Sequence, residues 1–366
     1  MTCEHKMSWA LRRSAPFLEV CASRTPEVFA DKMSRVGSET RDLLIVGAGP
    51  SGLAVAIAAD RAGLDYEVIE KGVLVNSIFH FPRAMTFFTT PDLLEIGGLP
   101  FVTPYEKPTQ WEALRYYRRV ADTYRLRIAF GEEVVEIKRD DSGFALRTRS
   151  EEGERERRTR SVAFATGYYD HPNRLGVTGE DLPHVTHYYD EPHPWYRRPV
   201  VIVGGKNSAA IAALELCRAG ATVTLVHRQP QLADSIKYWI KPDIENRIKD
   251  GAVRALFETR VVGIRSRSVL VEGPAGRREV AADGVFLMTG YRPETRLLAD
   301  VGVRIDPATL KPEHDPETLE TNVPGLFLAG SVAAGLETSK IFIETGRFHG
   351  EAIVKALASR ARDQRE

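Results

Sequence analysis

Cysteine is scarce in this chain, which carries only three cysteines among 366 residues. Cys3, Cys21 and Cys217 form no CxxC pair and no spacing typical of metal ligands. The sequence therefore argues against a dithiol that cycles between oxidised and reduced forms, and we expect no metal site. So few cysteines are also typical of a protein in a reducing compartment, and we expect a cytoplasmic location.

Net charge and long apolar runs are absent as well. Lysine plus arginine and aspartate plus glutamate both number 50, so the net charge is zero and gives no electrostatic basis for binding nucleic acid or an anionic membrane. No apolar stretch approaches the ~20 residues that span a bilayer. We therefore expect neither a nucleic acid nor a membrane as partner. The length of 366 residues suffices for two domains.

Residues 1–40 mix arginines with acidic residues and contain no continuous apolar core. The missing core argues against a secretory signal, and the acidic residues argue against an organellar transit peptide. We expect a flexible N-terminal extension here, or a start codon assigned too early.

Two glycine turns are the most informative feature that is present. The first, residues 47–52, follows the apolar run 43–46 and precedes an alanine-rich helix expected at residues 53–62. A strand expected at residues 66–69 then ends at Glu70, about 20 residues after the turn, as the dinucleotide-binding fingerprint requires.

The same order of elements repeats later in the chain. Residues 204–209 form the second turn, after the apolar run 200–203 and before a helix expected at residues 209–219. A strand at residues 222–226 follows. Both units then close on a Thr-Gly-Tyr phrase, at residues 166–168 and again at 289–291. This duplication predicts an α/β fold with two Rossmann-like dinucleotide-binding domains, whose bound nucleotides face each other.

The three glycines of the first turn have separate expected roles. Gly47 permits the tight bend, Gly49 lets the backbone approach a pyrophosphate, and Gly52 lets helix and strand pack closely. The free N–H groups at residues 51–53 attract that anion. In the second turn, Lys206 replaces the middle glycine and Ala209 the third, so Lys206 either adds charge at the pyrophosphate or points into solvent.

The residue that ends the second strand of each unit indicates which nucleotide is bound. The carboxylate of Glu70 can accept hydrogen bonds from ribose hydroxyls and would repel a 2′-phosphate, which favours FAD or NAD over NADP. The corresponding residues His227 and Arg228 suit a 2′-phosphate, because guanidinium binds phosphate oxygens bidentately. We therefore expect NADPH at the second turn; the alternative is that Arg228 is only a surface residue.

The tail of the chain is expected to return to the first unit. Residues 321–330 resemble a strand that, in flavoproteins with two dinucleotides, returns to the first domain and ends under the flavin ring. A helix is then expected to start after Gly330, where its dipole would face the flavin. The predicted organisation is thus an extension at residues 1–40, a discontinuous FAD-binding domain at 41–170 and 291–366, and an NADPH-binding domain at 171–290.

Beyond these motifs, the chain resembles the bacillithiol disulfide reductase (YpdA-type) family, which has a thioredoxin-reductase-like architecture. The phrases that carry the resemblance lie at residues 70–72, 74–78, 85–88, 179–183, 185–189, 342–344 and 346–352. The resemblance implies that the protein is an enzyme and that it forms a homo-oligomer (dimer or tetramer). It would pass hydride from NADPH to FAD and on to a low-molecular-weight thiol disulfide.

The motifs and the resemblance together yield one set of expected cofactor-binding residues. They are Gly47, Gly49, Pro50, Ser51, Gly52, Glu70, Lys71, Asn76, Ser77, Val134, Thr166, Gly167, Gly204, Lys206, Asn207, Ser208, Ala209, His227, Arg228, Thr289, Gly290, Gly330 and Ser331.

One departure from the family concerns the candidate catalytic position, Ser51. The family commonly has cysteine there, and a serine hydroxyl cannot form a mixed disulfide. Three alternatives therefore stay open: a reductase of another acceptor such as ferredoxin or a quinone, a flavin monooxygenase-like hydroxylase, and a non-enzymatic redox sensor. His80, His187 and His349 are candidate acid–base groups or structural hydrogen-bonding residues.

Overall fold

The computed structural model describes residues 40–338 and 340–363. The extension expected at residues 1–40 therefore lies, apart from Thr40, outside the described residues.

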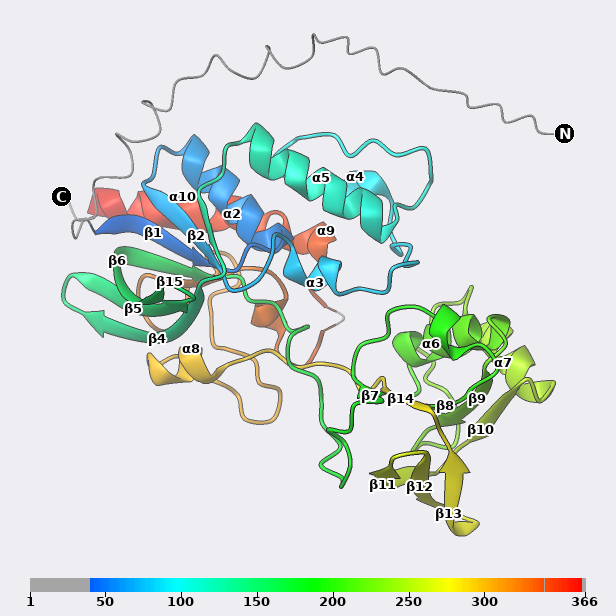
Figure 1. Cartoon of the computed structure of the whole chain (residues 1–366). Coiled ribbons are helices and arrows are strands. Elements are labelled where there is room, and N and C mark those ends of the chain that lie inside the picture. The colour runs from blue at the N-terminus through cyan, green and yellow to red at the C-terminus, as the bar shows by residue number, and fades with distance from the viewer. Residues whose placement is uncertain (1–39, 339, 364–366) are drawn as a thin grey trace, which may run out of the picture. The chain divides into compact units, whose positions relative to one another are not determined.

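The first unit is built on a parallel sheet whose strands come from both ends of the described chain (Figure 1). All neighbours in the order β3-β2-β1-β6-β15 pair in parallel. These strands are β1 (Arg41–Val46), β2 (Tyr66–Glu70), β3 (Ile128–Phe130), β6 (Gly153–Phe164) and β15 (Leu326–Leu328). The C-terminal strand β15 thus returns to the first sheet, as the sequence predicted. Four consecutive residues of β1 are buried, because helices or strands cover both faces of a parallel sheet.

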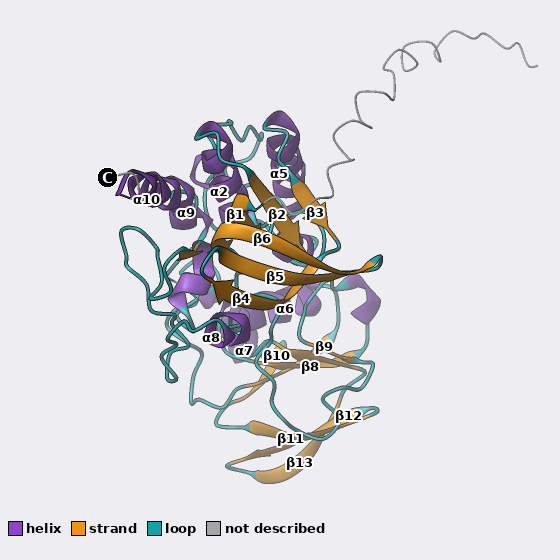
Figure 2. Cartoon of the chain, turned by 90° about the vertical axis from the view of Figure 1, so that its left-hand side faces the viewer, coloured by secondary structure: helices purple, strands orange, loops and turns teal. Residues whose placement is uncertain are grey.

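Strand β6 also belongs to an antiparallel layer. Its first half pairs with β5 (Gly143–Ser150), which pairs in turn with β4 (Glu133–Asp140), and Figure 2 shows the three strands side by side. Arginine and glutamate side chains alternate along these strands and form cross-strand ion pairs. Because most of these pairs are exposed, they add little stability.

Helices cover the other face of the first sheet. Helix α2 (Pro50–Arg61) packs against α10 (His349–Asp363), and a Cβ at Gly350 would lie 2.5 Å from the Ala54 carbonyl oxygen. Helix α5 (Gln110–Thr123) begins with a capping box, in which Thr109 and Glu112 bond reciprocally. The short helices are α3 (Asn76–Phe79), α4 (Pro91–Leu94), α8 (Arg296–Asp300) and α9 (Ile343–Gly346).

The helix expected directly after Gly330 is only partly present. Residues Gly330–Ala334 form a five-residue 3₁₀ helix, η2, and Gly335 ends it with a φ of +58°. A single short 3₁₀ turn thus stands where a helix was expected, and so short a turn has little dipole to direct at a flavin.

The second unit repeats the architecture of the first. Its parallel sheet has the order β10-β9-β8-β14-β7, and β11, β12 and β13 form a separate antiparallel layer (Figure 2). The strands are β7 (Val185–Thr186), β8 (Pro199–Val203), β9 (Thr222–Val226), β10 (Val253–Leu256), β11 (Arg260–Arg265), β12 (Ser268–Gly273), β13 (Gly276–Ala281) and β14 (Gly284–Leu287). The helices are η1 (His193–Trp195), α6 (Asn207–Arg218) and α7 (Lys241–Lys249).

The two sheets therefore confirm the predicted α/β class with two dinucleotide-binding units. Among residues 40–338 and 340–363, no helix is both long and apolar enough to cross a membrane. The same residues contain no cluster of three histidine, cysteine or acidic side chains arranged for a metal ion.

Candidate dinucleotide-binding sites

In the first glycine turn, packing leaves no room for a side chain at two of the glycines but does leave room at the third. A Cβ at Gly47, whose φ is +106°, would lie 2.6 Å from the Ala165 carbonyl oxygen. A Cβ at Gly52 would lie 2.0 Å from the Gly47 carbonyl oxygen, whereas one at Gly49 would meet no atom within 4 Å. Gly49 therefore faces free space at the start of α2, where Pro50 occupies the first helical position. This space fits a pyrophosphate.

The carboxylate of Glu70 fixes the first turn through hydrogen bonds. Its Oε2 accepts a hydrogen bond from the Ala48 N–H at 2.7 Å, and its Oε1 accepts one from the Gly72 N–H at 2.8 Å. The residue is only 5% exposed, and burial raises its pKa against the effect of the two bonds. Each oxygen keeps a second acceptor position, so the carboxylate can shape the turn and still bind a ribose hydroxyl.

Thr166 has a buried polar atom that the protein leaves unsatisfied. Its Oγ1 is without a hydrogen-bond partner among the described residues, and such atoms in a native structure call for a ligand or water. The adjacent Gly167 has a φ of +67°, and a Cβ there would meet only the Ser331 Oγ, at 3.8 Å. Thr166, Gly167 and Ser331 thus lie together beside open space, and these residues fit a flavin nucleotide.

The other residues expected around FAD differ in what their side chains contact. Lys71 forms an ion pair with Asp170 at 2.8 Å, and the Asn76 Oδ1 accepts a long hydrogen bond from the Val73 N–H at 3.4 Å. Ser77 lies in α3, which Asn76 begins. Val134 is 6% exposed and packs in the core at a bulge of β4, so only its backbone is available to a ligand.

The Ser51 hydroxyl lies where the start of α2 meets the C-terminal segment. A Cβ at Gly330 would lie 2.5 Å from the Ser51 Oγ, and a Cβ at Gly346 would lie 2.6 Å from it. Two glycines are thus required on either side of this small side chain. Cys217, the one cysteine that the described residues include, lies on α6 with its Sγ 3.7 Å from the Ala252 carbonyl oxygen, and so takes no part in this junction.

His349 is a structural hydrogen-bonding residue at the same junction. Its Nδ1 accepts a hydrogen bond from the Gly330 N–H at 3.1 Å. Burial, helped by the nearby His314, lowers the pKa of His349 to about 4. The ring is therefore neutral at pH 7, with its proton inferred on Nε2, and it is poorly suited to donate a proton near neutral pH.

The other two candidate histidines are not brought to the turn by any contact. The His80 Nδ1 lies 2.9 Å from the Asn76 carbonyl oxygen on the exposed end of α3. The His187 Nε2 lies 3.3 Å from the Glu180 Oε1, but neither ring nitrogen has a hydrogen bond in suitable geometry. Burial lowers the pKa of His187.

The second turn is occupied by the side chain of His227. A Cβ at Gly204 would lie 2.5 Å from the Met288 carbonyl oxygen, whereas a Cβ at Gly205 would lie 2.3 Å from the His227 ring. Burial and the charge of Arg228 lower the pKa of His227, so the ring is neutral at pH 7. Of the two basic residues expected to face a 2′-phosphate, exposed Arg228 carries the permanent charge.

Asn207, which we expected to bind NADPH, also hydrogen-bonds to the loop that follows β9. Its Oδ1 accepts a hydrogen bond from the Lys237 N–H at 2.9 Å, and its Nδ2 donates one to the Ser235 carbonyl oxygen at 3.3 Å. The Ala233 N–H also donates to the Gly205 carbonyl oxygen at 2.9 Å. The segment between β9 and α7, residues 227–240, is thus tied to the turn. Lys206 and Ser208 are exposed, and Ala209 is buried.

The two Thr-Gly ends lie on segments that pair with each other. The Thr289 Oγ1 donates to the Asn173 carbonyl oxygen at 2.6 Å, and the Asn173 N–H donates to the Gly290 carbonyl oxygen at 2.9 Å. Tyr291 packs on Tyr169 with 4.4 Å between ring centroids. Sequence reasoning missed this aromatic contact, because Tyr169 lies one residue beyond the first Thr-Gly-Tyr phrase.

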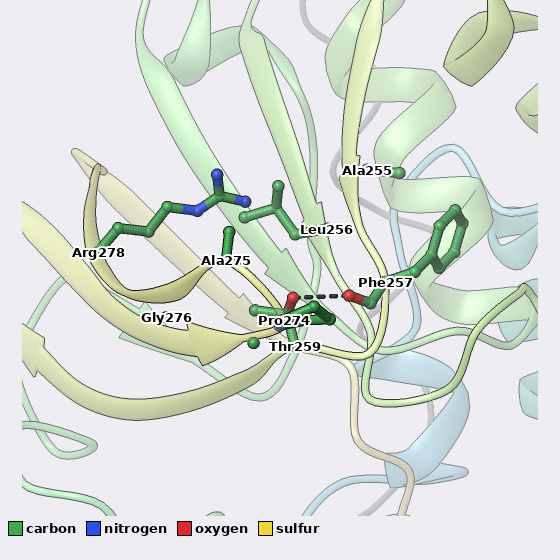
Figure 3. A pocket seen from close by; sticks show the side chains of 9 residues that line it. Ala255, Leu256, Phe257, Thr259, Pro274, Ala275, Gly276 and Arg278 are labelled. Carbon is green, nitrogen blue, oxygen red and sulfur yellow. Dashed lines mark hydrogen bonds between the residues drawn. The ribbon is translucent and has the colours of Figure 1, made fainter.

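A separate small cavity lies beyond the carboxyl end of β10 (Figure 3). Its volume is about 210 Å³, and Thr259, Ala275 and Arg278 are among its lining residues. Ligand pockets of drug size usually have at least ~300 Å³, so this cavity is too small for a dinucleotide. The Thr259 N–H donates to the His227 carbonyl oxygen at 3.0 Å, which places the cavity beside the end of β9.

Two sheets of the same order, each with a glycine turn after its middle strand (β1 and β8), define a protein that holds two dinucleotides. Residues 44–330 match the family model described as pyridine nucleotide-disulphide oxidoreductase, and the chain belongs to this family of enzymes.

Within this family the similarity is to one group. The chain is 43% identical over 321 residues to the bacilliredoxin reductase Bdr of Bacillus subtilis, a match that covers 87% of this chain and 97% of that protein. The solved bacillithiol disulfide reductase Bdr (YpdA) of Bacillus cereus is 40% identical, with a TM-score of 0.86 over 88% of this chain and all of that one. The Staphylococcus aureus structure of the same title is 38% identical, with a TM-score of 0.83 over 88% and 99% of the two chains. These similarities favour the disulfide reductase reading over the hydroxylase and the sensor.

Proposed function

We propose that this protein is an NADPH-dependent flavoprotein that reduces a low-molecular-weight disulfide of the bacillithiol type. The overall reaction is NADPH + H⁺ + RSSR → NADP⁺ + 2 RSH. FAD is assigned to residues 41–170 and 291–366, and NADPH to residues 171–290. We further propose a cytoplasmic homo-oligomer. The names of the similar proteins from Bacillus and Staphylococcus support the disulfide acceptor.

The observation that carries this proposal is the unequal chemistry of the two glycine turns. The first turn is held by the buried carboxylate of Glu70, which suits a nucleotide without a 2′-phosphate. The second turn is followed by exposed Arg228, for which the described residues provide no carboxylate within 4 Å. A resident FAD and an exchanging NADPH account for both environments.

The residues of the first turn would hold the flavin nucleotide without taking part in bond making. Gly49 leaves room for the pyrophosphate, Glu70 accepts from the ribose, and Thr166 finds a partner for its unsatisfied hydroxyl. When bound, FAD supplies the two-electron chemistry that links NADPH to the acceptor. Ser51 packs between Gly330 and Gly346 and offers no thiol, so the acceptor must be reduced without a mixed disulfide at this position.

The test is an acceptor assay on purified, flavin-loaded protein. Bleaching of the flavin absorbance by NADPH, but not by an equal concentration of NADH, is expected first. Bacillithiol disulfide should then be consumed with release of two thiols per NADPH. Flavin reduction without thiol release at high enzyme concentration would reject the disulfide acceptor.

Ser51 favours one second candidate, a reductase of another acceptor such as ferredoxin or a quinone. The same assay, run with these acceptors in place of the disulfide, distinguishes the two. The proposed function predicts slower NADPH consumption with ferredoxin or quinone than with bacillithiol disulfide.

A further inference from the structure

Two lysines from distant parts of the chain converge on the ring of Trp239. The Lys107 Nζ, just before α5, lies 4.1 Å from the ring centroid. The Lys237 Nζ, from the segment between β9 and α7, lies 5.9 Å from the same centroid and 5.6 Å from that of Phe88. The Phe88 and Trp239 rings meet edge to face with 5.9 Å between centroids. We call these four residues the lysine–aromatic cluster.

The cluster carries positive charge without a matching carboxylate. Within residues 40–338 and 340–363, neither lysine has an acidic group within 4 Å, unlike Lys71, Lys241 and Lys340. Both lysines are half-buried. Their distances to one ring put the two ammonium groups no more than about 10 Å apart, close to the ~8 Å over which salt screens charges. The rings satisfy the lysines only in part, since exposed cation–π contacts are weak.

The cluster is also placed between the two nucleotide-binding units. Phe88 and Lys107 belong to the segment that covers the first sheet. Trp239 and Lys237 lie on the segment that Asn207 fastens to the second glycine turn. Nearby, the Arg83 guanidinium and backbone N–H both bond to Asp190, which joins the same two units. The cluster therefore draws its residues from both units.

We propose that the lysine–aromatic cluster recognises a carboxylate of the electron acceptor, so that this enzyme prefers disulfides that carry negative charge. This inference rests on the proposed function. The ammonium groups of these two half-buried lysines would attract a carboxylate. The rings of Phe88 and Trp239 are 37% and 40% exposed, so the cluster is open to a ligand. A phosphate of NADPH has the same chemistry, and the test separates these two sources.

The test compares bacillithiol disulfide, whose malyl groups carry carboxylates, with its methyl ester, which lacks the carboxylate charges. Isothermal titration measures the binding of each disulfide to the oxidised, flavin-loaded protein. The variant Lys107→Gln/Lys237→Gln should bind the acid at least about tenfold more weakly, because two charge-assisted contacts are lost. Its affinity for the ester should change less than about twofold. Lys249→Gln/Lys355→Gln, which removes the same charge from α7 and α10, serves as the matched control and should bind like wild type.

Two other outcomes would overturn the proposal. Equal loss of acid and ester binding would make the cluster a structural contact and overturn the proposal. A raised Michaelis constant for NADPH with unchanged acid binding would assign the lysines to the dinucleotide and also overturn it. Lys107→Arg/Lys237→Arg keeps both charges and should retain the preference for the acid if the Gln variant does not fold.

Binding requires no turnover, so the two proposals fail separately. Selective binding of the acid without thiol release would reject only the disulfide reductase activity. Thiol release by a wild-type enzyme that binds acid and ester equally would reject only the lysine–aromatic cluster as a recognition site.

Discussion

The hydrogen bond between His349 and Gly330 makes the stability of the first unit depend on pH. His349 accepts from the Gly330 N–H at 3.1 Å, and burial lowers its pKa to about 4 from an ordinary value near 6.5. Protonation would place a second donor against the Gly330 N–H and break the bond. The variant His349→Asn keeps an acceptor oxygen near the position of Nδ1 but removes the titrating group.

The direction of the effect follows from the lowered pKa. Between pH 6.5 and pH 4 the unfolded chain binds a proton at His349 and the folded chain does not, so falling pH favours unfolding. The contribution is fully present above pH 6.5. From the two pKa values it falls by about 2 kcal/mol on going from pH 7.5 to pH 5, and by about 3 kcal/mol in total at still lower pH.

Urea unfolding at pH 7.5 and pH 5, followed by near-ultraviolet circular dichroism, measures this difference. Wild type should lose about 2 kcal/mol more free energy of unfolding than His349→Asn over this interval. At pH 7.5, His349→Leu should cost about 1–3 kcal/mol, because the Gly330 N–H is left without a partner. Equal losses in wild type and His349→Asn would refute the reasoning.

Substitutions at three further positions test the two turns. Arg228→Ala should raise the Michaelis constant for NADPH about tenfold or more and that for NADH less than about twofold, and equal effects in steady-state kinetics would contradict the 2′-phosphate assignment. Ser51→Ala should keep turnover within about threefold of wild type, while Ser51→Cys should make the NADPH-reduced enzyme sensitive to iodoacetamide. Inactivation of wild type by iodoacetamide would instead reveal a thiol in use. Glu70→Gln, which turns an amide donor toward the Ala48 or Gly72 N–H, should purify with less bound flavin by the ratio of visible to ultraviolet absorbance.

The sequence predicted those features that depend on local chemistry. The need for glycine at positions 47 and 52 follows from the turn itself. In the structure, a Cβ at either position would clash with a backbone oxygen. The Thr109–Glu112 capping box needs only four consecutive residues, so it too depends on the local sequence alone. The repeated strand–turn–helix pattern predicted a second dinucleotide-binding unit, and β8, α6 and β9 provide it.

Features that depend on contacts between distant residues were not predictable in the same way. The spacing of the second turn does not reveal that the His227 ring covers Gly205, since this depends on the path of β9. The sequence also does not reveal that the Asn207 Oδ1 accepts a hydrogen bond from the Lys237 N–H, because this requires knowing where that segment folds. Only the tertiary structure brings Trp239 to Phe88.

The most direct test of the account is the ratio of thiol released to NADPH consumed after all accessible cysteines have been alkylated. With bacillithiol disulfide as acceptor and oxygen excluded, the account predicts two thiols per NADPH and a rate unchanged by alkylation, because no protein thiol at position 51 is needed. NADPH oxidation without thiol release, or complete loss of activity on alkylation, would contradict it.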